Sequence, residues 1–123
     1  MLLFLYGTLL DPAVLDRHAA EPGLHRRLRP ARLRGFARVA LRGTPYPTLM
    51  PRPGAVTEGA VLRAGPAARR RLAAYEGPEY RLMPVRLDTP RGPVRARAWI
   101  MAPFGLRAEP SAGPWPCTGR PGG

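Results

Sequence analysis

A run of alternating residues constrains the fold of this chain more than any other feature. From Ala31 to Arg42, small or apolar residues alternate with positions that are mostly arginine. The residues expected on the buried face of a strand are Ala31, Leu33, Gly35, Ala37, Val39 and Leu41. The arginines expected on its outer face are Arg32, Arg34, Arg38 and Arg42. This period of two predicts a half-buried strand, with a bend at Gly35.

Other segments predict further short strands and two helices. The remaining strands are expected at residues 2–6, 46–50, 56–62, 80–88 and 94–101. One helix is expected to start at Asp11-Pro12 and to stop before Pro22-Gly23, and a second to span residues 66–75. The chain beyond Pro103 is expected to be loop-like. The pattern therefore predicts an α+β arrangement with mostly antiparallel pairing.

The length of 123 residues and a hydrophobic content of 45% fit a single folded domain. We expect this domain at residues 1–109, followed by a Pro/Gly-rich tail at residues 110–123. A single cysteine excludes an internal disulfide framework. No apolar run approaches the roughly 18 residues that cross a bilayer, and no basic residue precedes the apolar start. A cytoplasmic protein without a membrane partner is expected.

The charge of the chain is strongly positive. Twenty basic residues against eight acidic ones give a net charge of +12, and every basic residue is arginine. Such a surplus attracts polyanions. An all-arginine composition with many Pro, Gly and Ala residues is also what a GC-rich coding sequence produces, so the charge is weak evidence for a nucleic-acid partner.

Glu76 has the most unusual setting among the carboxylates. It follows the predicted second helix, directly before Gly77-Pro78 and behind an apolar face. Burial and the partial negative charge at a helix C-terminus both raise the pKa of a carboxyl group. Such a group can take and return a proton near neutral pH, as a general acid–base must. The alternative is a structural ion pair between Glu76 and a nearby arginine.

A second candidate site lies where the first predicted strand ends. Its residues are Tyr6, Gly7, Thr8 and Leu9. A strand that ends in Gly-Thr can turn its backbone N–H groups outward, where they suit a carboxylate or an oxyanion. A strand followed by a glycine turn is common in many folds, so this segment indicates a binding site only when it is considered together with Glu76.

Several short motifs follow one another in a fixed order. They are Tyr6-Gly7-Thr8-Leu9, Tyr46-Pro47 with Leu49, Val56 with Gly59, Leu72-Ala73-Ala74-Tyr75-Glu76-Gly77, Tyr80 and Val85. In this order and spacing, the chain resembles the gamma-glutamylcyclotransferase-like family over residues 1–101. Two positions depart from the family's pattern. Its aspartate before the aromatic–Glu pair is Ala73 or Ala74 here, and its arginine after the tyrosine falls on Leu82.

The resemblance implies a small mixed, mostly antiparallel β-barrel flanked by helices, with a cavity at one end. It implies that the turn at residues 6–9 binds the glutamyl part of a small γ-glutamyl substrate, and that Glu76 shuttles protons. Tyr80 would either hydrogen-bond within the cavity or form an aromatic wall. The implied reaction closes 5-oxoproline and releases an amine, with no cofactor and no metal. Association between copies of the chain is left open.

Other readings of the sequence stay open. A non-catalytic module of the same fold would use an arginine-rich face, including Arg32, Arg34 and Arg38, for nucleic acid or another polyanion. The same site would alternatively act on a γ-glutamyl group of a biosynthetic intermediate, or would be catalytically silent. Trp99 is expected to point outward from its strand, either at an interface or in local packing.

Overall fold

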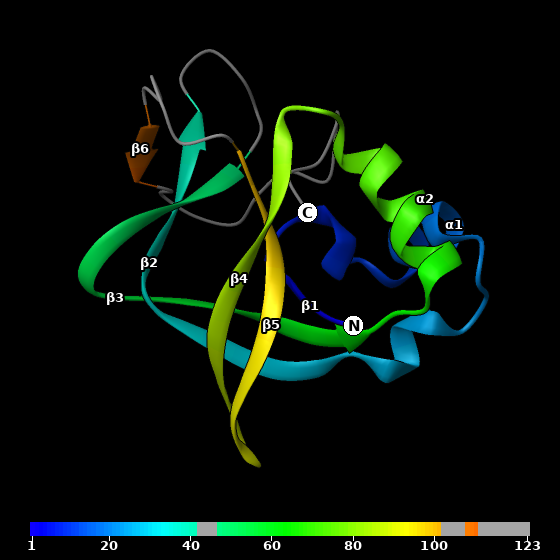
Figure 1. Ribbon diagram of the computed structural model, residues 1–123, viewed down its shortest axis with the longest axis horizontal. Helices are drawn as coiled ribbons and strands as arrows, with labels where there is room; N and C mark the ends of the chain where they lie inside the picture. Colours follow the sequence, from blue (N-terminus) through cyan, green and yellow to red (C-terminus); the bar gives the residue numbers. More distant parts are fainter. Residues whose placement is uncertain (42–46, 102–107, 111–123) are drawn as a thin grey trace.

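The computed structural model describes residues 1–41, 47–101 and 108–110 of the chain. The strands are β1 (Leu2–Leu5), β2 (Arg29–Leu41), β3 (Pro47–Arg63), β4 (Tyr80–Thr89), β5 (Gly92–Met101) and β6 (Ala108–Pro110). The α-helices are α1 (Pro12–Ala19) and α2 (Pro66–Glu76), and short 3-10 helices occur at η1 (Thr8–Leu10) and η2 (Leu24–Arg27). The strands gather on one side and the helices on the other (Figure 1).

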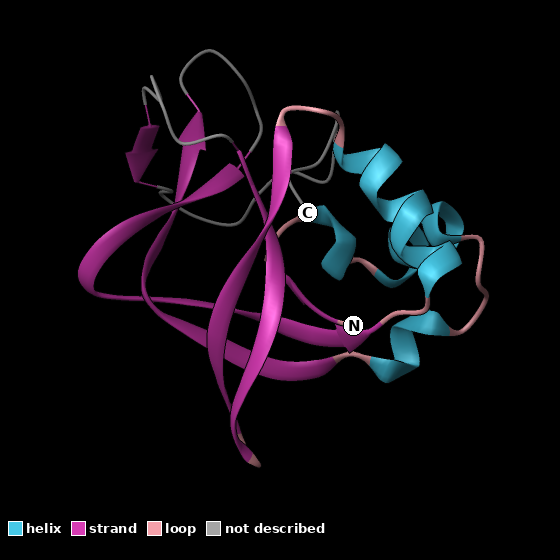
Figure 2. Ribbon diagram, viewed as in Figure 1, coloured by secondary structure: helices cyan, strands magenta, loops and turns pink. Residues whose placement is uncertain are grey.

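Five strands close into a barrel in the order β3-β1-β5-β4-β2, because β2 also pairs with β3. All of these pairs are antiparallel except β1 with β5. The helices pack against one flank of the barrel (Figure 2). The prediction of a mixed, mostly antiparallel barrel flanked by helices is therefore confirmed.

Two details of the predicted strands need correction. The segments expected at 46–50 and 56–62 form one long strand, β3, that bends along its length; residue 46 itself lies outside the described part of the chain. The region beyond Pro103 is not wholly loop-like, because β6 pairs with the end of β2. The predicted tail lies outside the described residues from position 111 onward.

A bulge at Gly35 corrects the predicted faces of β2. Arg34 pairs with Val56, whereas Phe36 pairs with Pro51, so the register shifts between them. Gly35 has a φ of +83°, in the region that favours glycine. The register changes by three residues, and a change by an odd number moves the following side chains to the opposite face. The predicted bend is present, but strict alternation across it is wrong.

The bulge exchanges the faces of the residues that follow it. Phe36 joins the cluster inside the barrel. Arg38 pairs with Leu49, which lies in the same cluster. Because directly opposite residues share a face, Arg38 lies on the interior face rather than on the expected outer one.

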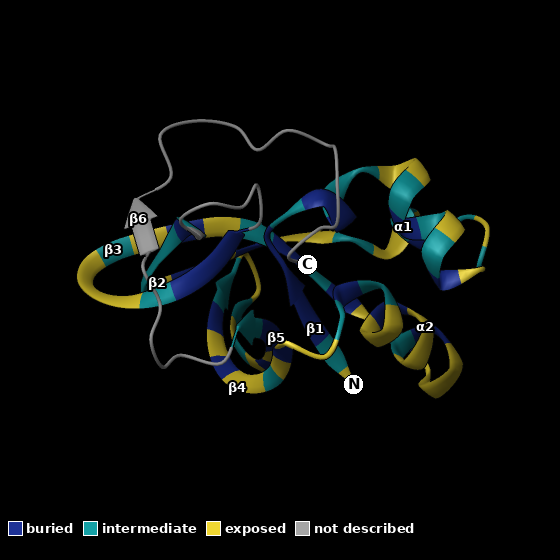
Figure 3. Ribbon diagram, turned by 90° about the horizontal axis from the view of Figure 1, so that it is seen from above, coloured by how far each residue is buried: buried dark blue, intermediate teal, exposed yellow. Residues whose placement is uncertain are grey.

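The core consists of two apolar clusters on either side of the barrel wall. The cluster inside the barrel includes Phe4, Tyr6, Leu33 and Leu87. The other lies between the barrel and the helices and includes Leu3, Leu5, Leu15, Leu72 and Trp99. The strand β1 contributes to both clusters and is buried from its second residue onward (Figure 3).

Trp99 points out of the barrel, as expected, but only 3% of its surface is exposed. It packs in the cluster beneath the helices. Local packing therefore explains Trp99, and the alternative of an exposed interface residue is wrong.

Local signals in the sequence set the helix ends. The Asp11 carboxylate accepts hydrogen bonds from the amides of Ala13 and Val14 at 2.9 and 3.4 Å, as an N-cap does, and Pro12 follows it. Helix α2 begins at Pro66 and ends before Gly77. No helix in the described part of the chain is long and apolar enough to cross a membrane.

Candidate active site

Glu76 is the last residue of α2, and its side chain is 0% exposed. Ala68 and Leu72 precede it at intervals of four residues and are buried with it. This spacing puts the three side chains on one face of the helix. Gly77 then leaves the helix at φ 96° and ψ 166°, a conformation that is open almost only to glycine. The chain therefore turns away directly after Glu76.

The Glu76 carboxyl group has no hydrogen-bond partner among the described residues. Within that part of the chain, neither of its oxygens accepts or donates a hydrogen bond. No ion pair in the described part of the chain includes it. The alternative that Glu76 forms a structural ion pair with an arginine is therefore wrong for the described residues. Burial raises the pKa of Glu76 well above its ordinary value of 4.5.

Tyr6 is a titratable residue whose phenol is affected by the charge of Glu76. Burial raises the pKa of the Tyr6 phenol well above 10.0, and the charges of Glu76 and Tyr80 raise it further. The Tyr6 hydroxyl donates a hydrogen bond to the backbone carbonyl of Trp99. A hydrogen bond with Thr48 acts in the opposite direction and lowers the phenol pKa. Tyr6 therefore stays a neutral hydrogen-bonding group beside the acid.

Tyr80 and Thr48 hold the strand ends around this region. The Tyr80 hydroxyl donates to the carbonyl oxygen of Pro47 at 2.7 Å. The Thr48 hydroxyl oxygen accepts from the amide of Met101 at 3.0 Å. This bond is made to the protein backbone, so the choice between a hydrogen bond within the cavity and an aromatic wall stays open for Tyr80.

The turn after β1 lies next to α2. The Thr8 hydroxyl and the Tyr75 hydroxyl are 3.3 Å apart and share a hydrogen bond. Tyr75 directly precedes Glu76 in the helix. The predicted neighbourhood of the first strand's exit and the second helix's end is therefore present in the fold.

The backbone of this turn has donors without acceptors. The amides of Leu10 and Asp11 donate back to Gly7 and Thr8, each at 3.0 Å. Those amides that begin the short helix η1, of Thr8 and Leu9, have no acceptor within the described residues. The Leu9 side chain is buried in the core between the barrel and the helices, so only the backbone of Leu9 could contact a ligand. Binding by this turn, and the hollow expected beside Glu76, stay predictions.

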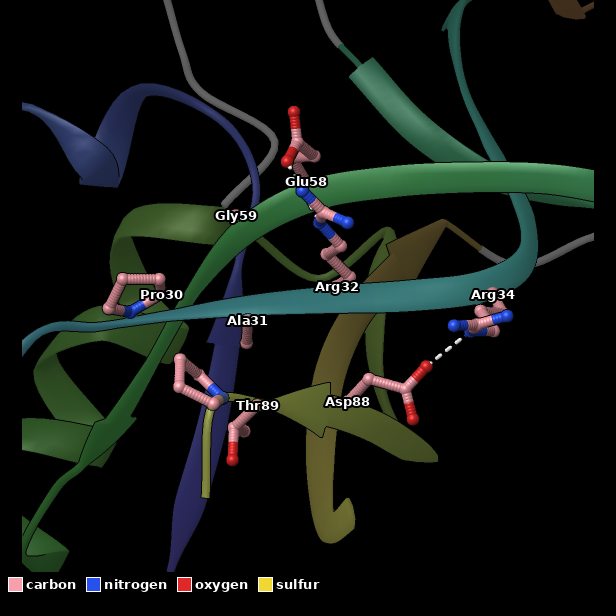
Figure 4. A pocket seen from close by; sticks show the side chains of 9 residues that line it. Pro30, Ala31, Arg32, Arg34, Glu58, Gly59, Asp88 and Thr89 are labelled. Carbon is pink, nitrogen blue, oxygen red and sulfur yellow. Dashed lines mark hydrogen bonds and ion pairs between the residues drawn. The ribbon is translucent and has the colours of Figure 1, made fainter. Parts of the chain in front are cut away.

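A cavity of about 360 Å³ lies elsewhere, beside the place where β2 pairs with β4. Arg34 forms an ion pair with Asp88 there, and Arg32 donates to Glu58 at 3.0 Å (Figure 4). Asp88 is eight residues along β4 from Tyr80, which is about 26 Å at roughly 3.3 Å per residue. The lining of this cavity includes none of the candidate site residues.

Sequence reasoning did not identify three residues of this region. Thr48 and Tyr75 contact predicted site residues. Apart from the family pattern, no sequence motif marks their hydroxyl groups as part of a site. Arg38 was expected on the outer face; Gly35 signalled a bend, but the register shift that places Arg38 inside is seen only in the pairing with β3. The described residues hold no cluster of three or more metal-ligating side chains.

A closed mixed barrel with two flanking helices is the fold of gamma-glutamylcyclotransferase structures. The chain belongs to the family described as gamma-glutamyl cyclotransferase, AIG2-like, which matches residues 3–117. This match confirms the resemblance found in the motifs. A search of curated proteins finds no match.

Solved structures with this fold include two proteins from Arabidopsis thaliana. One is 24% identical with a TM-score of 0.70, over 81% of this chain and 61% of its own length. The other is 27% identical with a TM-score of 0.67, over 81% of this chain and 67% of its own. A gamma-glutamyl cyclotransferase is 20% identical with a TM-score of 0.64, over 90% of this chain and 71% of its own.

The two departures from the family's pattern fall near the site. Ala73 and Ala74 are exposed on α2. Leu82 is partly buried and packs against the helix-side core. An apolar contact therefore stands at the position where the family carries a charged side chain.

Proposed function

We propose that this protein is an enzyme that cyclises a γ-glutamyl amide to 5-oxoproline and releases a free amine, with Glu76 as the general acid–base. One observation supports this assignment most strongly. A fully buried carboxyl group with no hydrogen bond from the described residues is costly, and groups of this kind are concentrated at functional sites. Family membership supplies the class of reaction.

The substrate would provide the partner that Glu76 lacks. A γ-glutamyl group carries an α-ammonium, which would form a buried ion pair with the Glu76 carboxylate. In the free protein, burial favours the neutral acid. A bound cation favours the anion, which then acts as a base. Glu76 would therefore change its protonation state when substrate binds.

A single proton carrier, Glu76, is sufficient for the proton balance of the reaction. The Glu76 carboxylate takes a proton from the α-ammonium, and the resulting amine attacks the γ-carbonyl carbon, forming the ring C–N bond. Glu76 returns that proton to the departing nitrogen as the old C–N bond breaks. A second proton follows from the ring nitrogen to the released amine, which leaves as an ammonium. No net proton is taken up or lost.

Intramolecularity would contribute much of the rate. Nucleophile and carbonyl belong to one molecule, and well-oriented intramolecular reactions reach effective molarities on the order of 10⁵ M or more. The site therefore has to hold one substrate molecule in a folded conformation and does not have to bring two reactants together. The amides of Thr8 and Leu9 would receive the developing oxyanion or the substrate carboxylate, and Tyr6 and Tyr80 would line the same region.

The experiment is a screen of γ-glutamyl amines and γ-glutamyl dipeptides for release of 5-oxoproline. Glu76→Gln keeps the size of the side chain but cannot carry a proton, so we expect turnover to fall by about 10²- to 10⁴-fold. Glu79→Gln is the matched control, because Glu79 is exposed and three residues away. Equal turnover by wild type and Glu76→Gln would refute the role of Glu76.

The alternative of a nucleic-acid module gains no support. Arg32 and Arg34 are each paired with a carboxylate, and Arg38 lies inside the barrel. Of the outer row of arginines expected from the sequence, these three therefore do not form an uncompensated basic surface, and Arg42 lies outside the described residues.

A further inference from the structure

Arg38 is a cation on the interior face of a small barrel. Its register partner is Leu49, which lies in the interior cluster together with Tyr6. The side chain is half-buried, and burial lowers the pKa of its guanidinium. An arginine remains protonated near neutral pH even so. The barrel interior therefore holds a partly dehydrated positive charge.

This charge lies at the exit of β1. The Nη1 atom of Arg38 donates a hydrogen bond to the carbonyl oxygen of Tyr6 at 3.0 Å. The next residues of the chain form the turn whose Thr8 and Leu9 amides have no acceptor within the described part. A guanidinium and two backbone donors are thus gathered at one place, which suits an anion.

Tyr6 connects this cation to the acid. Its carbonyl oxygen accepts from Arg38, while the charge of Glu76 acts on its phenol. A buried acid and a half-buried cation therefore both have Tyr6 as a neighbour. A γ-glutamyl group has the two matching charges on one carbon atom, an α-ammonium and an α-carboxylate.

We propose that Arg38 binds the α-carboxylate of the γ-glutamyl substrate, so that the amides of Thr8 and Leu9 serve the oxyanion. This inference rests on the proposed function. The hydrogen bond to Tyr6 fixes the planar guanidinium, whose five N–H donors suit a carboxylate. Arg38 would thereby set specificity for a free α-carboxylate, and Glu76 would take the neighbouring ammonium.

The test compares two substrates that differ only at this group. One is a γ-glutamyl alkylamine with its α-carboxylate, and the other is the same compound with an α-carboxamide. Both keep the α-amine and the γ-amide, so both can cyclise and release the same amine. Release of that amine is measured as kcat/KM for wild type, Arg38→Gln, Arg38→Lys and Arg34→Gln.

A charge-assisted hydrogen bond corresponds to a preference of about 10- to 100-fold, so wild type should prefer the carboxylate substrate by that factor. Arg38→Gln should lose most of this preference, because its kcat/KM should fall for the carboxylate substrate and stay unchanged for the carboxamide substrate. Arg38→Lys should restore part of it. Arg34→Gln should keep the wild-type ratio, because the Arg34 side chain lies on the outer face of the same strand and is 78% exposed.

The outcomes separate the two claims. If wild type prefers the carboxylate and Arg38→Gln keeps the same ratio, this inference is overturned while the proposed function stands. If Arg38→Gln loses both substrates equally, Arg38 only supports the Tyr6 carbonyl, and the inference is again overturned. If wild type releases amine from neither substrate, the proposed function fails, and the inference fails with it.

Discussion

At the scale of single residues, Glu76 combines complete burial with the lack of a hydrogen bond within the described part of the chain. Its burial follows from its place four residues after Leu72 on the buried face of α2. The described residues that bury it supply no donor to either oxygen. A carboxyl group in this state lowers the stability of the fold, and a ligand that supplies a partner for it would recover that free energy.

We therefore expect Glu76→Met to stabilise the protein. Methionine has a similar length and needs no hydrogen bond, and a buried polar group without a partner costs about 1–3 kcal/mol. The free energy of unfolding at neutral pH should rise by a comparable amount, as measured by urea denaturation.

The pH dependence of this gain has a definite sign. A folded carboxyl with a raised pKa keeps its proton where the unfolded chain has lost it, so wild-type stability falls as pH rises above about 4.5 toward the raised value. Methionine does not titrate. The advantage of Glu76→Met should be small below that range and should grow with pH. A variant less stable than wild type at neutral pH would instead indicate an ion pair.

The sequence predicted where Glu76 lies, but it did not predict that the carboxyl group has no ion-pair or hydrogen-bond partner among the described residues. Helical spacing and the following glycine place an acid at the end of a buried face. Whether one of the many arginines reaches it depends on long-range packing, which spacing along one element does not describe. The two alternatives therefore stayed open until the neighbours of the carboxyl were known.

At the scale of elements, one glycine decides which residues of β2 face the interior. Alternation correctly predicted that Ala31 and Leu33 are buried. It failed for Arg38 because the shift at Gly35 exchanges the faces beyond it. A glycine in a strand signals a bulge or a bend, but its register depends on the partner strand and is not written in the sequence of β2.

A second glycine, Gly59 on β3, is required by close approach of a neighbouring strand. A Cβ atom built there would lie 2.2 Å from the Leu5 carbonyl oxygen and 2.9 Å from the Phe4 ring. The backbone has to shift to relieve this contact, so Gly59→Ala should lower the free energy of unfolding by about 1–3 kcal/mol or more. Thermal unfolding measures the loss.

Gly65→Ser is the matched control for Gly59→Ala. Nothing lies within 4 Å of a Cβ atom at Gly65, which precedes α2 at the N-cap position. Serine is a favourable N-cap residue, so this variant should keep or slightly raise stability. A similar loss in both variants would contradict the role assigned to the contact between β1 and β3.

At the scale of the whole molecule, closure of the barrel brings together residues that are far apart in the sequence. Tyr6, Thr48, Glu76 and Trp99 come from four different segments, and Tyr6 interacts with the other three. The family resemblance predicted the pairing of the turn with Glu76. Thr48 could not be predicted, because its contact depends on how β3 and β5 meet.

The charge of the whole molecule predicts a dependence on salt. The net charge is +12, and Arg86 lies directly opposite Arg95 across β4 and β5. Like charges in opposite positions repel. Raising ionic strength from about 0.01 M to about 0.15 M shortens the Debye length from roughly 30 to roughly 8 Å, so the melting temperature should rise. A fall in melting temperature would mean that the surface ion pairs outweigh this repulsion.

The central claim is that Glu76 is a buried, unpaired acid that awaits the ammonium of its substrate. Carbon-13 NMR of the Glu76 carboxyl, assigned by its absence in Glu76→Gln, tests this most directly across a range of pH. In the free protein the titration midpoint should lie well above 4.5. L-Norleucine, which keeps the α-ammonium and α-carboxylate but has no side-chain carbonyl for the amine to attack, should lower this midpoint. An ordinary midpoint in the free protein, or no change with L-norleucine, would contradict the account.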